Sequence, residues 1–203
     1  MSIAARPYET LLAKGEDRKQ RILSVAERLL ARNGWRSTSL AQIAREAGVT
    51  PAGLLHHFES KEQLLNAVLD ARDADDDAHA DRATGDLITE IRRVAERFDR
   101  APELIGTFTV LLVENIAADA PLHDRLLNRY RSAVDIIAQI IRRGQSAGRY
   151  RAGIDPAVKA AEIIGFVTGM ETTWLLDPSI PLTDVFRGYT ESLASELQPT
   201  RTT

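Results

Sequence analysis

Two short helices joined by a glycine turn are the feature that most restricts the fold of this chain. Ser39 and Gln42 have the spacing of a capping box, in which side chains three residues apart close the first turn of a helix. Gly48 ends that helix, and Thr50 followed by Pro51 starts the next one, with threonine as the N-cap and proline at the first helical position. This pattern predicts a helix-turn-helix motif.

Helical periodicity also dominates the rest of the chain, and no segment alternates apolar and polar residues as a strand would. Asn33 and Gly34 are expected to end the helix before the motif, because both residues tolerate a positive φ angle. A second capping box, from Ser60 to Gln63, begins the helix after it. Further helices are expected over residues 86–100, 103–118, 121–147, 156–177 and 183–197. The fold class is therefore predicted to be all-α.

The helices are expected to form two domains. Residues 1–15 show little pattern and are interpreted as a flexible arm. Residues 16–66 form the helix-turn-helix domain, whose last helix continues to about residue 82, and residues 83–203 form a helical domain for regulation and dimerisation. The acidic run of residues 73–81 lacks the glycine and glutamate of a calcium loop, so it is interpreted as a solvated helix end.

Charge is divided unevenly between these domains. The whole chain carries a net charge of −3, yet residues 1–61 carry ten basic and six acidic residues. That end is therefore net +4 and the remaining chain is net −7. A basic end favours nucleic acid as its partner. With no cysteine and no apolar run long enough to span a membrane, the chain is expected to be cytoplasmic, without a membrane partner.

The second helix of the motif is expected to enter the major groove of DNA with its outward face. Small and apolar residues on that face can contact a thymine methyl group, while Thr50 and His56 can form hydrogen bonds with base edges or phosphates. His57 is expected to pack against the core beside Phe58 instead. The outward residues are Thr50, Pro51, Ala52, Gly53, Leu55 and His56.

Residues 34–65 resemble the DNA-binding end of the TetR family of repressors. The matches in register are Gly34, Thr38, Ser39, Ile43, Ala44, Ala47, Gly48, Val49, Thr50, Leu54, His57, Phe58, Ser60, Lys61, Glu62 and Leu64. The resemblance implies a dimeric regulator with a helical ligand domain. It also implies phosphate contacts by Thr38 and Lys61, whereas the family's tyrosine is Leu55 here. Each contact has a plainer alternative, since Lys61 can be a solvated first-turn residue and Thr38 can simply cap a helix.

Three further residues complete the expected DNA-binding set. Ser39 matches the family pattern beside Thr38, and Arg36 and Arg45 lie on either side of it. Both arginines can reach phosphate, or they can be ordinary surface charge.

An effector pocket and a dimer interface are the two sites expected in the C-terminal domain. The resemblance makes stripes on three helices candidates for a ligand cavity, although such stripes are also typical of an ordinary core. They comprise Phe108, Leu111, Leu112, Asn115, Tyr130, Val134, Phe166, Met170 and Trp174. A stripe of small residues allows close approach of another helix, either from a partner chain or from the same chain. It comprises Ala161, Gly165, Gly169 and Thr172.

The leading hypothesis is a homodimeric repressor that binds a palindromic double-stranded DNA operator and responds to a small-molecule effector of unknown identity. No catalytic constellation, metal-ligand pattern or cofactor motif is present, so we expect neither an enzyme nor a cofactor. The alternative is a helical protein that keeps the helix-turn-helix as a scaffold and binds a ligand or a protein partner. A helical enzyme is a more distant third.

Overall fold

The computed structural model describes residues 7–79 and 86–199 of the chain. The described residues form helices and no strand, in agreement with the predicted all-α class. The helices are α1 (Pro7–Ser37), α2 (Leu40–Glu46), α3 (Pro51–His57), α4 (Lys61–His79), α5 (Leu87–Arg100), α6 (Pro102–Glu114), α7 (His123–Ser146), α8 (Pro156–Leu176) and α9 (Leu182–Leu197).

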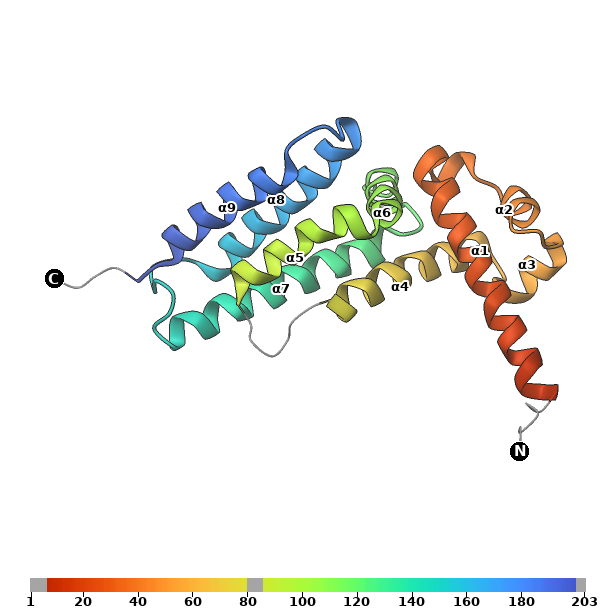
Figure 1. The fold of residues 1–203 in the computed structure, drawn as a ribbon, viewed down its shortest axis with the longest axis horizontal. Helices are drawn as coiled ribbons and strands as arrows, with labels where there is room; N and C mark the ends of the chain where they lie inside the picture. Colours follow the sequence, from red (N-terminus) through yellow and green to blue (C-terminus); the bar gives the residue numbers. More distant parts are fainter. Residues whose placement is uncertain (1–6, 80–85, 200–203) are drawn as a thin grey trace.

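The first three helices form a small domain, and α4 connects it to an elongated bundle (Figure 1). In the bundle α7 packs against α8 and α5 packs against α9. Helix α6 lies between the two parts and packs along α1, which makes it the main link between them.

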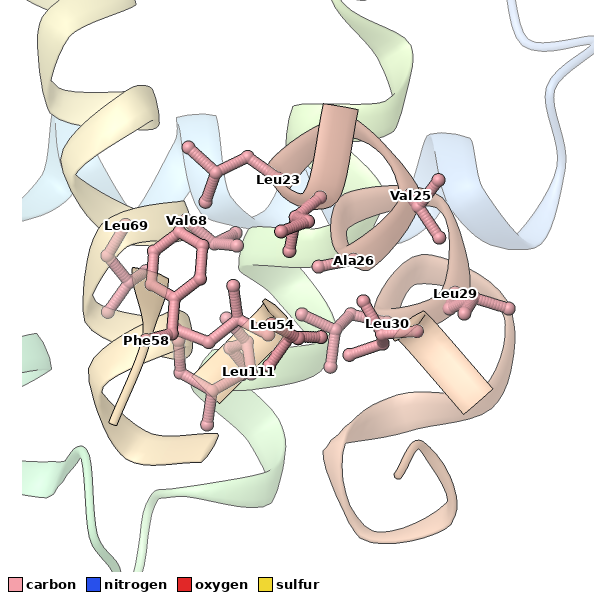
Figure 2. Close-up of a cluster of buried hydrophobic side chains, with 14 of the residues drawn as sticks. Leu23, Val25, Ala26, Leu29, Leu30, Leu54, Phe58, Val68, Leu69 and Leu111 are labelled. Carbon is pink, nitrogen blue, oxygen red and sulfur yellow. The ribbon is translucent and has the colours of Figure 1, made fainter. Parts of the chain in front are cut away.

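A first apolar core joins the small domain to α6. Leu23, Val25, Ala26, Leu29 and Leu30 of α1 belong to one buried cluster with Leu54, Phe58, Val68, Leu69 and Leu111 (Figure 2). Leu30, Leu54 and Leu111 are completely buried. Because Leu111 belongs to α6, this first core extends from the small domain into the body. A second core lies inside the bundle, around Phe98, Ile141, Ile163, Phe186 and Leu193.

The start of α1 corrects one expectation. Residues 7–15 are helical and do not form a flexible arm, while residues 1–6 lie outside the described residues. Pro7 occupies the first helical position, where the missing N–H of proline is not needed, and most of the following residues have high helix propensity. The predicted break at Gly34 is confirmed, since its φ of 74° and ψ of 171° are not helical.

Helix α6 is shorter than expected and ends at Glu114 instead of residue 118. The buried Asn115 stops it, because its side-chain amide donates to the Leu111 carbonyl at 2.8 Å and its side-chain oxygen accepts from the Leu122 backbone N–H at 3.3 Å. Asparagine therefore closes the end of α6 and directs the chain toward α7.

Candidate nucleic-acid interface

The two helices of the motif begin as the capping signals predict. Ser39 Oγ accepts a hydrogen bond from the Gln42 backbone N–H at 3.1 Å, and Thr50 Oγ1 accepts one from the Gly53 N–H at 3.0 Å. Gly48 lies between them with a φ of 67°, a conformation that glycine adopts without steric cost. These local bonds fix where α2 and α3 start and leave both hydroxyl hydrogens available as donors.

One face of α3 is buried and the other is open. Leu54 is completely buried in the first core, together with Ile43 and Ala44 of α2, and so holds α3 at a fixed orientation. On the opposite face Leu55 is 45% exposed. The other outward residues are Thr50, Pro51, Ala52 and His56, all exposed, and Gly53, which is half-buried. The structure therefore gathers the predicted base-reading residues on one surface, and their contact with DNA stays a prediction.

The two neighbouring histidines of α3 differ in exposure. His56 is exposed, whereas His57 is half-buried and its Nε2 has no hydrogen-bond partner. The two rings meet edge to face, with centroids 5.6 Å apart. Burial lowers the pKa of His57, and the nearby His56, Arg18 and Lys19 lower it further. The environment of His57 therefore favours its neutral form.

Arg18 and Lys19 are basic residues of α1 close enough to α3 to influence His57, and they lie outside the helix-turn-helix pattern. Only the excess of positive charge in residues 1–61 pointed to them. Arg36 and Arg45, which were singled out, are both exposed.

Thr38 does not lie on the open surface. Its side chain is 1% exposed, and Oγ1 donates to the Gly34 carbonyl oxygen at 2.8 Å. The hydroxyl thus closes the irregular end of α1, as the plainer alternative held. We leave its side chain out of the proposed DNA-contacting surface.

Lys61 is at the expected place, the first residue of α4, but its ammonium group already has partners. Nζ donates to the Trp35 carbonyl oxygen and lies 4.2 Å from the centroid of the Trp35 ring. Burial lowers the pKa of Lys61, and the carboxylate of Glu114 acts in the opposite direction. The expected phosphate contact stays a prediction, and the free protein holds this lysine against the end of α1.

The residues expected to line an effector pocket are divided between the two cores. Leu111, Phe108 and Leu112 belong to the first core, and the side-chain amide group of Asn115 is used in closing α6. Phe166, Met170 and Trp174 pack on the second core. Tyr130 is 45% exposed and Val134 is half-buried. The structure therefore does not bring the set around one cavity.

Two surface hollows lie elsewhere, around the loop between α7 and α8. One, of about 220 Å³, is lined by residues of that loop together with Lys159, Glu162 and Glu196. The other, of about 340 Å³, is lined by Gln145, Tyr150, Pro199 and further loop residues.

A buried cluster of arginines and carboxylates, which no local sequence pattern predicts, connects α4, α5, α7 and α8. Arg72 of α4 and Arg97 of α5 both reach Oε1 of Glu171 in α8, at 2.6 and 3.4 Å. Asp76 of α4 pairs with Arg97 and with Arg129 of α7. Burial lowers the pKa of Arg129 to about 10, and the like charge of Arg72 adds to this effect. The acidic end of α4, expected to be solvated, is instead an ion-paired connection to the body.

The small-residue stripe of α8 faces outward. A Cβ atom added at Gly165 or Gly169 would meet nothing within 4 Å. Thr172 is also exposed and Ala161 is half-buried. Of the two alternatives, packing of the two glycines against another described helix of the same chain is excluded.

Comparison with known proteins supports the interpretation of the motif. Residues 22–68 match the family model for bacterial regulatory proteins of the tetR family. The HTH-type transcriptional regulator SrpR of Pseudomonas putida is 24% identical over 164 residues, covering 78% of this chain and 75% of SrpR. UidR of Escherichia coli K12, also an HTH-type transcriptional regulator, is 24% identical over 172 residues, covering 80% and 84%.

Solved structures share the fold over most of the chain. NalD, the secondary repressor of the MexAB-OprM multidrug efflux pump in Pseudomonas aeruginosa, superimposes with a TM-score of 0.73 at 22% identity. The alignment covers 92% of this chain and 98% of NalD. A complex of SmeT with triclosan gives a TM-score of 0.74 at 21% identity, covering 87% and 91%. Among the described residues, no helix is both long and apolar enough to cross a membrane.

Proposed function

Because this chain belongs to the TetR family of bacterial regulatory proteins, we propose that it represses transcription by binding a palindromic DNA operator as a homodimer. A small molecule that binds the body releases it from DNA. The chain is a transcription regulator of the helix-turn-helix type, and the repressor role, the operator and the effector are the parts that we propose.

The observation that carries the proposal is the open face of α3. Its inner residue Leu54 is completely buried, while Leu55 on the other side is 45% exposed among the described residues. A rigid short helix with a small, apolar outer face fits the major groove and can read thymine methyl groups.

The outward stripe of α8 supports dimerisation. Gly165 and Gly169 leave open space above the helix, so a helix of a second copy can approach closely. Gly188 of α9 is open in the same way. Two copies joined through α8 and α9 would place two α3 helices in successive major grooves, about 34–36 Å apart.

Release by an effector requires a ligand that binds better to a form with a different α3 spacing. We place the effector in the body, where α6 is in contact with both the bundle and the small domain. SmeT, a structural neighbour, was solved with triclosan, and for this chain we propose only a small, largely apolar molecule.

Gel shifts with DNA that flanks the gene test this function. Leu55→Glu adds a negative charge to the open face of α3 without disturbing the core, so it should weaken binding at least about 100-fold. Ile136→Glu is the matched control, because Ile136 is 57% exposed on α7, away from the motif. Tight ligand binding without DNA affinity would favour the alternative scaffold function instead.

A further inference from the structure

Glu114, the last residue of α6, reaches the DNA-binding domain at the irregular end of α1. Its Oε2 accepts a hydrogen bond from the Trp35 backbone N–H at 2.6 Å. Its Oε1 lies where a side chain at Gly34 would begin, 2.6 Å from the position of a Cβ atom. Glycine at position 34 is therefore what allows the carboxylate to approach the backbone so closely.

Trp35, whose backbone N–H binds Glu114, contacts Lys61 through its carbonyl oxygen and its ring. The Trp35 carbonyl oxygen accepts a hydrogen bond from Lys61 Nζ, and the ammonium group lies 4.2 Å from the ring centroid. A carbonyl and an aromatic face both favour a cation at this place. The three residues thus form a chain of contacts from α6 through the end of α1 to the start of α4.

We propose that Glu114 is a positioning residue that restrains Lys61 in the free protein and so limits its contact with a DNA phosphate. This inference rests on the proposed function. To meet a phosphate fully, the ammonium group must give up part of its interaction with Trp35 and with the field of the Glu114 carboxylate. Because Glu114 belongs to α6, any shift of α6 changes how readily Lys61 is released.

The arrangement gives the body a second means of controlling DNA affinity. A change in the distance between the two α3 helices acts on both half-sites together, whereas Glu114 acts on a backbone contact within each copy. The contact with phosphate is independent of base sequence. Restraint of Lys61 should therefore alter binding to any duplex, not only to the operator.

Glu114→Gln is the central variant, because glutamine keeps the shape and an acceptor oxygen for the Trp35 N–H while it removes the charge. Binding to a random-sequence duplex is measured by fluorescence anisotropy over a series of salt concentrations. We expect affinity to increase by about threefold or more, with a steeper salt dependence. Asp119→Asn is the matched control, since it removes an exposed carboxylate just beyond α6.

A double-mutant cycle tests whether the effect acts through Lys61. In a Lys61→Met background the restrained cation is gone. Adding Glu114→Gln should therefore leave the affinity within about twofold of that of the Lys61→Met variant. An equal gain in both backgrounds would show a general charge effect and overturn the inference. An unchanged affinity in the single Glu114→Gln variant would overturn it too.

Trp35 fluorescence provides a readout that needs no DNA. In a Trp174→Phe background the remaining tryptophan is Trp35, and its emission should shift when Glu114→Gln loosens Lys61 from the ring. If Trp35 emission is the same with and without Glu114→Gln, the proposed restraint of Lys61 by Glu114 is contradicted. If the wild-type chain binds no duplex at all, the proposed function fails as a whole. If it binds and the variants behave alike, only the inference about Glu114 fails.

Discussion

Arg72 Nη2 lies 2.6 Å from Oε1 of Glu171 in the interior of the protein, with both side chains at most 5% exposed. Arg72 belongs to α4, which leaves the DNA-binding domain, and Glu171 belongs to α8, which carries the outward glycine stripe. This pair therefore joins α4 to the helix that carries the proposed dimer interface. The Arg72 guanidinium also lies 4.4 Å from the centroid of the Phe108 ring in α6.

Glu171→Ala should lower the free energy of unfolding by about 3–5 kcal/mol, because it leaves the buried charges of Arg72 and Arg97 without this partner. Chemical denaturation measures the change. Glu191→Ala, at an exposed position of α9, is the control and should have little effect. Equal stabilities of the two variants would contradict the role given to the buried cluster.

Gly34→Ala should destabilise the protein by about 1–3 kcal/mol, because φ of 74° with ψ of 171° is a region open essentially to glycine alone. The added methyl group would also meet Glu114 Oε1 at 2.6 Å. Gly48→Ala is the comparison, since Gly48 also has a positive φ but open space around it. Thermal melts should show the larger loss at position 34, and the reverse order would contradict the close approach of Glu114.

Glu27 of α1 should contribute a decrease in stability as pH rises from about 4.5 to about 7. Burial raises its pKa from 4.5 to about 7, and Glu103 adds to the effect. Within that window the folded state holds a proton that the unfolded state has lost, so the free energy of unfolding decreases with pH and then levels off. Glu27→Gln should flatten this dependence in thermal melts between pH 4.5 and 8. Parallel profiles for both proteins would exclude Glu27 as the cause.

Gly169→Glu should convert the proposed dimer to a monomer, because a charged side chain would enter the contact that we propose between two α8 helices. Apart from its own stretch of helix, no atom of the described residues lies within 4 Å of a Cβ atom at this position, so the protomer should still fold. Light scattering gives the mass and circular dichroism checks the helix content. Ser132→Glu, on an exposed part of α7, is the control, and a Gly169→Glu dimer would place the interface elsewhere.

Local signals in the sequence were enough to predict the motif. The starts of α2 and α3 follow from Ser39, Thr50 and Pro51, because a cap involves residues only a few positions apart. The break at Gly34 was predicted for the same reason. The end of α6 was not, since Asn115 acts together with the backbone of Leu122 in the next segment.

Contacts between distant parts of the chain could not be predicted in this way. Trp35 and Glu114, or Arg72 and Glu171, are brought together only by the packing of α1, α4, α6 and α8. No local spacing distinguishes these residues from surface charges. The same reason explains why Thr38 was assigned to a surface that its side chain does not reach.

The most direct test of the repressor function is a footprint of the wild-type protein on an operator selected from random DNA at moderate salt. We expect two protected half-sites related by a two-fold axis, with centres about 34–36 Å apart along the duplex. Leu55→Glu should abolish both together. A single protected half-site of fixed stoichiometry, or no protection at any protein concentration, would contradict a dimeric repressor that reads DNA with the open face of α3.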